Sequence, residues 1–232
     1  MSSSPTALTS TTVSSSYCSS PPDSPARRAR DQKPVAIIAC GAIAGEVRAA
    51  IRRSGRGSED VEVHTLPPLL HNRPQLIAGA VERLIGHLQA AGRTVVVAYA
   101  DCGTYGALDD VCRRLSVRRL RGLHCYDVFA GASRVADVFA DEPGTYLLTD
   151  FLVRSFRRTV MNQLALDVHP ELWPDYFGNY RRVVWLAQRP SEELHRQARS
   201  IAEMFGLPLE VIETGTDRLA DELDLLLEQA TV

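Results

Sequence analysis

The chain has 232 residues, of which 45% are hydrophobic and 23% are charged, and its net charge is −2. This composition is ordinary for a globular protein, and the near-neutral charge gives no reason to expect nucleic acid or an anionic membrane as a partner. No apolar run is long enough to span a bilayer, and Lys33 is the only lysine, which excludes Schiff-base and P-loop chemistry in the predicted domain.

Residues 1–33 are rich in Ser, Thr and Pro and show no hydrophobic period. This composition predicts a disordered tail, although it also resembles an organelle transit peptide. We expect residues 34–232 to form a single α/β domain. The five cysteines are widely spaced and odd in number, and no secretory signal precedes them, so we expect a reducing, cytoplasmic setting.

Short apolar runs alternate with amphipathic stretches along the rest of the chain. In the first half we expect strands at 35–39, 61–66 and 94–98, and helices at 42–53, from Pro74 to about 92, and at 107–115. In the second half we expect a brief strand end at 123–126 and strands at 146–148, 183–187 and 209–212. We expect helices at 131–139, 191–205 and 216–227, and a further helix that begins at 151. The segment 167–179 is aromatic and is expected to be irregular.

This alternation predicts a three-layer α/β sandwich with a mostly parallel central sheet. Residues 35–41 and 96–103 have similar sequences, and each is followed by another glycine and a predicted helix. The similarity indicates that the fold contains two similar half-units.

Three cysteines come directly after different predicted strands: Cys40, Cys102 and Cys125. Because ligands bind at the carboxyl ends of strands in an open parallel sheet, we expect the three thiols to share one edge. Their wide spacing is unlike that of a zinc ribbon, but a fold-assembled site of three thiolates could hold zinc or a four-iron cluster. Cys102 also precedes a predicted helix, whose dipole would favour its thiolate form.

Other polar residues are predicted to support this site. His71 is a candidate fourth ligand or acid/base group, and Asp101 and Asp150 are candidate catalytic or orienting carboxylates. Gly41 and Gly103 could offer backbone N–H groups to an anionic ligand. Structural alternatives are core packing for the cysteines, a loop-fixing role for His71 and helix capping for Asp150.

Four segments in this order resemble the domain-of-unknown-function 1638 family of bacteria and archaea: Leu66–Pro74, Asp101–Gly103, His124–Tyr126 and Gly144–Leu152. The resemblance extends from about 35 to 227. Relatives often accompany corrinoid-dependent methyl-transfer systems, so it implies a corrinoid or methyltransferase protein as partner. One departure is Tyr105, which occupies a turn expected to be richer in glycine and is therefore expected to narrow the pocket.

The leading hypothesis is a cytoplasmic metal-thiolate protein that binds zinc or an iron–sulfur cluster. As an enzyme it would act on a small molecule by alkyl transfer, hydrolysis or elimination. One alternative is a non-catalytic carrier or sensor of a metal or cofactor. Another is a metal-free enzyme in which Cys102 is the nucleophile and His71 the base.

Overall fold

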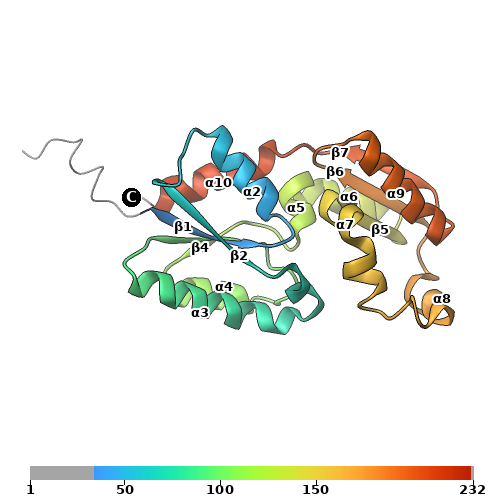
Figure 1. Cartoon of the computed structure of the whole chain (residues 1–232), viewed down its shortest axis with the longest axis horizontal. Helices are drawn as coiled ribbons and strands as arrows, with labels where there is room; N and C mark the ends of the chain where they lie inside the picture. Colours follow the sequence, from blue (N-terminus) through green and yellow to red (C-terminus); the bar gives the residue numbers. More distant parts are fainter. Residues whose placement is uncertain (1–33, 231–232) are drawn as a thin grey trace, which may run out of the picture. The chain divides into compact units, whose positions relative to one another are not determined.

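The computed structural model describes residues 34–230 (Figure 1). The expected disordered tail at 1–33 lies outside these residues. Residues 34–230 belong to one compact unit. Within 34–230, no helix has both the length and the apolar character needed to cross a membrane.

The first sheet contains four parallel strands in the order β2-β1-β3-β4. They are β1 (Val35–Cys40), β2 (Val61–Leu66), β3 (Val95–Ala98) and the very short β4 (Arg118–Arg119). Every residue of β1 and β3 is buried. Continuous apolar strands of this kind are typical of parallel sheets covered on both faces.

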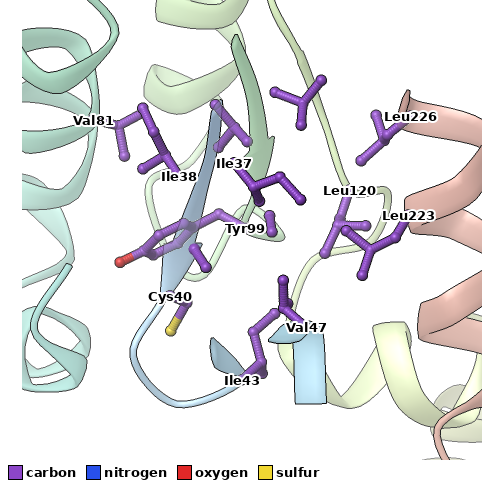
Figure 2. Close-up of a cluster of buried hydrophobic side chains, with 14 of the residues drawn as sticks. Ile37, Ile38, Cys40, Ile43, Val47, Val81, Tyr99, Leu120, Leu223 and Leu226 are labelled. Carbon is purple, nitrogen blue, oxygen red and sulfur yellow. The ribbon is translucent and has the colours of Figure 1, made fainter. Parts of the chain in front are cut away.

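Helices cover both faces of this sheet (Figure 1). They are α2 (Ala44–Arg53), α3 (Ile77–Ala90), α4 (Ala107–Arg114) and α10 (Asp217–Ala230). α10 packs on α2, β3 and β4, while α3 packs on α4, β1 and β3. Figure 2 shows the resulting core, in which Leu223 and Leu226 of α10 and Val81 of α3 approach the sheet from different helices.

The second sheet has three parallel strands, β5 (Thr145–Thr149), β6 (Arg182–Ala187) and β7 (Leu209–Glu213), in that order. Side chains of β6 alternate between two cores: Trp185 packs with residues of α7 (Asp150–Phe156) and α9 (Glu192–Phe205), and Val184 packs with α6 (Ala132–Asp141). α7 continues as a π-helical turn, η3 (Arg157–Met161). The alternation follows from the two-residue period of a strand.

The aromatic segment at 167–179 is more ordered than the irregular stretch we expected. It contains a 3₁₀ turn, η4 (Pro170–Leu172), and a short helix, α8 (Trp173–Phe177). The Phe177 ring lies 4.8 Å from that of Phe205 and 5.8 Å from that of Tyr146, between ring centroids. The segment is therefore packed against the second sheet and its helix α9.

The predicted α/β class with parallel strands is confirmed, and the strands divide between two sheets rather than forming one central sheet. The two similar segments form β1 and β3, which are neighbours in the first sheet, so their similarity does not mark the two sheets. The expected strand end at 123–126 is wrong. Helix α5 (Cys125–Ala130) begins there, because the Asp127 carboxylate accepts hydrogen bonds from the N–H groups of Leu123 and His124.

Candidate metal centre

Cys40 is the last residue of β1, and its side chain is only 1% exposed. The chain then turns toward α2, and the N–H of Ala42 donates to Cys40 Sγ at 3.3 Å. Figure 2 shows the Cys40 side chain at the end of β1 with the Tyr99 ring beside it. The thiol therefore lies at the carboxyl edge of the first sheet, as expected from the sequence.

His71 belongs to η1 (Pro68–Asn72), a 3₁₀ turn that follows β2. Its Nδ1 lies 3.1 Å from the carbonyl oxygen of Pro68, and both ring nitrogens are near Cys40 Sγ, at 3.8 Å (Nδ1) and 3.9 Å (Nε2). Because a carbonyl only accepts, Nδ1 carries the proton in the neutral ring and Nε2 holds a lone pair. Burial lowers the pKa of His71, which favours this neutral form.

Cys102 lies in the turn between β3 and α4. Its backbone is left-handed, with φ of +52°, and its N–H donates to the Leu123 carbonyl oxygen at 2.7 Å. This hydrogen bond joins the turn to the loop that precedes Cys125. Cys125 is the first residue of α5.

Burial raises the pKa of all three thiols, and neighbouring thiols raise the pKa of Cys102 and Cys125 further. Burial raises the pKa of Cys40 to about 11. Burial and then the nearby Cys40 raise the pKa of Cys102 to about 12. The pKa of Cys125 is raised well above its usual value by burial, Cys102 and Cys40. In the metal-free protein, burial and the nearby Cys40 thus favour the protonated form of Cys102 over the thiolate expected from its position before a helix.

Tyr99 is a site residue to which the sequence analysis gave no role. It directly follows β3, is fully buried, and its ring is stacked on His71 with 6.3 Å between centroids and 10° between planes. Its hydroxyl has no hydrogen-bond partner within 34–230 but lies close enough to Cys40 to influence its pKa. The sequence did place a tyrosine at the end of a predicted buried strand. Because a buried hydroxyl normally needs a hydrogen-bond partner, this position could have indicated a role for Tyr99.

Asp101 holds the turn together. Its carboxylate accepts hydrogen bonds from the Thr104 hydroxyl at 2.6 Å and from the N–H groups of Tyr105 and Gly106 at 3.0 and 2.9 Å. Although burial acts in the opposite direction, these bonds lower the pKa of Asp101. Tyr105 itself is 96% exposed, so the expectation that it narrows a pocket is wrong.

Asp150 directly follows β5 of the second sheet, whereas Cys40 ends β1 and Cys102 follows β3 in the first sheet. Its fully buried carboxylate accepts hydrogen bonds from the Trp185 indole at 3.0 Å and from the N–H groups of Gln188 and Arg189 at 3.1 and 2.8 Å. The Arg154 guanidinium is 3.7 Å away. These contacts indicate that Asp150 anchors the loop after β6.

The two candidate glycines support packing. The N–H of Gly41 donates to the Leu66 carbonyl oxygen at 3.0 Å, so it is already used within the protein. Gly103 has φ of +80°, and a β-carbon there would lie 3.4 Å from the Pro74 ring. Both positions thus bring the cysteine-bearing turns close to the segment that carries His71.

These contacts bring three thiols and His71 to one edge of the first sheet without forming a closed ligand set. Within residues 34–230, no group of three His, Cys, Asp or Glu side chains stands close enough together to hold a metal ion.

A comparison with protein families finds a match to the description "Protein of unknown function (DUF1638)" over residues 65–223, which is more than half of the chain. The chain belongs to the DUF1638 family. No curated protein matches it, and no solved structure does. The DUF1638 match includes His71, Cys102 and Cys125, whereas Cys40 and the rest of β1 precede it.

Proposed function

We propose that this DUF1638 protein binds zinc or an iron–sulfur cluster through Cys40, Cys102, Cys125 and His71. The observation that carries the proposal is the separation of 3.9 Å between Cys40 Sγ and His71 Nε2. In a tetrahedral zinc site, the usual Zn–S and Zn–N bond lengths place sulfur and nitrogen about 3.6 Å apart. These two atoms lie near that spacing, but Cys40 Sγ is equally close to Nδ1 at 3.8 Å, so the His71 ring must turn for the Nε2 lone pair to face an ion shared with the thiol.

The orientation of His71 supports the same role. Metal-binding histidines usually donate their second ring N–H to a carbonyl or carboxylate, which selects the tautomer. The Pro68 carbonyl occupies that position beside Nδ1. The lone pair of Nε2 then remains available to a metal ion or to the Cys40 thiol proton.

The electrostatics of the thiols favour a cation over a nucleophilic mechanism. Each candidate thiol has a raised pKa, and a protonated thiol is a poor nucleophile. Cys40, the cysteine beside His71, is also almost completely buried. A bound cation would reverse the pKa shifts, because coordinated thiols are deprotonated.

Metal binding requires Cys102 and Cys125 to turn toward the Cys40–His71 pair. The turn that carries Cys102 is already linked to the loop before Cys125 by the hydrogen bond from the Cys102 N–H to the Leu123 carbonyl oxygen, so the two loops would move together. Zinc would supply Lewis-acid chemistry there, and a cluster would supply electron transfer or elimination chemistry.

Metal content of anaerobically purified protein tests the proposal. We expect stoichiometric zinc without colour, or iron with sulfide and visible absorbance. The variants Cys40→Ser, Cys102→Ser and Cys125→Ser are each expected to lose most of the metal. Cys112→Ala is the matched control, because Cys112 is a buried cysteine of α4 in the hydrophobic core and should leave the metal content unchanged.

The proposal is overturned if wild-type protein, folded and supplied with zinc or with iron and sulfide, takes up neither. It is also overturned if the three serine variants bind as much metal as Cys112→Ala. Rapid alkylation of one cysteine in metal-free protein, abolished by His71→Ala, would instead support the Cys–His nucleophile.

A further inference from the structure

A second feature lies between the edge of the first sheet and α10. It is a groove of about 740 Å³ lined by the end of α4, residues 117–122 and one face of α10. This volume lies within the range of about 300–1,000 Å³ typical of small-molecule sites. The groove is separate from the proposed metal ligands, since none of them lines it.

Four arginines and two carboxylates are among the residues that line the groove. Arg119 donates to both oxygens of Asp109, and Arg113 pairs with Asp110. Arg118, by contrast, contacts the neutral amide of Gln229 at 2.8 Å, and no hydrogen bond or ion pair is found for Arg121 with residues 34–230.

Two guanidinium groups in the groove thus lack an acidic partner within the described chain. Arginine forks match phosphate oxygens well, and the described part of the chain contains no lysine that could serve instead. The excess positive charge at Arg118 and Arg121 therefore favours an anionic ligand.

The opposite side of the groove carries an unused acceptor. Oε2 of Glu222 on α10 is buried and has no hydrogen-bond partner within 34–230, while Oε1 lies 3.5 Å from Arg218. A buried carboxylate oxygen without a donor is costly. Because Glu222 also lines the groove, rotation of its side chain would expose this oxygen to a hydroxyl or amino donor of a ligand.

We infer that the groove binds a small phosphate-bearing molecule that also carries a hydrogen-bond donor. Its phosphate lies against Arg118 and Arg121, and its donor group lies against Glu222. The apolar floor provided by Val117, Leu120 and Leu226 accommodates the less polar part of the ligand.

Calorimetric titration of the full chain with pyrophosphate and with ADP tests this inference. We expect saturable binding of both probes that weakens with added salt. The double variant Arg118→Ala/Arg121→Ala should bind both probes at least about tenfold more weakly, since each charge-assisted hydrogen bond is lost. Arg53→Ala, which removes an exposed arginine of α2, is the control and should bind like wild type.

The variant Glu222→Gln distinguishes the contact made by the phosphate of the ligand from the contact made by its hydrogen-bond donor. This variant removes a negative charge, so it should bind pyrophosphate as well as or better than wild type but ADP more weakly. The inference is overturned if neither probe binds saturably or if the double variant binds the probes like Arg53→Ala. It is also overturned if Glu222→Gln changes the affinity for both probes equally, or if a polyglutamate peptide displaces both probes. Thermal unfolding of each variant confirms that it is folded.

Discussion

Gly41 lies directly against Pro68. A β-carbon on Gly41 would stand 2.6 Å from Cδ of Pro68 and 2.7 Å from the carbonyl oxygen of Leu66. This contact joins the end of β1, which carries Cys40, to the turn that carries His71. The absence of a side chain at Gly41 therefore allows two proposed metal ligands to approach each other.

Gly41→Ala should separate these two segments. Since backbone and a proline ring must move to admit the methyl group, we expect a loss of about 1–3 kcal/mol in unfolding free energy together with weaker metal binding. Gly45→Ala is the control, because Gly45 lies in α2 and a β-carbon there would have no atom within 4 Å. It should raise stability by up to about 1 kcal/mol. Urea unfolding and metal titration measure both effects, and an unchanged Gly41→Ala would refute the packing argument.

The Asp150 carboxylate is expected to stabilise the fold without taking part in metal binding. Asp150→Ala leaves the Trp185 indole and two backbone N–H groups without their acceptor, so we expect a loss of about 3 kcal/mol or more in stability. Asp137→Ala, on the exposed side of α6, should change stability by less than about 0.5 kcal/mol. Metal content per folded protein should be unaffected in both variants. Metal loss confined to Asp150→Ala would restore a site role for this carboxylate.

Most elements of the fold could be predicted from the sequence because their apolar patterns are strong. β2 occupies 61–66 as expected, and β1, α4 and α9 differ from the expected ranges by no more than two residues at either end. Alternating patterns reveal that strands are parallel and buried, but not which strands pair. The division into two sheets depends on long-range contacts that no local pattern encodes.

The site was partly predictable for the same reason. Positions after strands place Cys40 and Cys102 at one edge, whereas the pairing of His71 with Cys40 depends on how the turn after β2 folds back. The hydrogen bonds of Asp150 could not be predicted from the sequence, because its partners Trp185 and Gln188 lie more than thirty residues away in the chain. Side-chain hydrogen bonding of this kind appears only once the strands are paired.

Tyr105 offers a test of backbone strain near the proposed centre. It is 96% exposed and has φ of +52°, a left-handed conformation that costs most residues about 1–2 kcal/mol. Asparagine tolerates this conformation better. Tyr105→Asn should therefore raise the unfolding free energy by up to about 1 kcal/mol, whereas Tyr176→Asn, at another exposed tyrosine in α8, has no such strain to relieve. Chemical denaturation that finds Tyr105→Asn less stable than wild type would contradict this account.

The Asp109–Arg119 pair predicts a pH dependence of stability. Arg119 donates to the two carboxylate oxygens at 2.6 and 2.9 Å and also to the carbonyl oxygens of Leu120 and Gly122, and its guanidinium lowers the pKa of Asp109. A carboxylate whose pKa is lower in the folded state stabilises the protein fully above its unfolded pKa of about 3.9, and this contribution disappears as the pH falls through the folded value. Because Asp109 is partly exposed, the contribution should be about 0.5–1 kcal/mol.

We expect Asp109→Asn to be less stable than wild type by this amount at neutral pH, with the difference vanishing in acid, as measured by urea unfolding across pH. A difference that persists below the folded pKa would assign the effect to altered hydrogen bonding instead of charge.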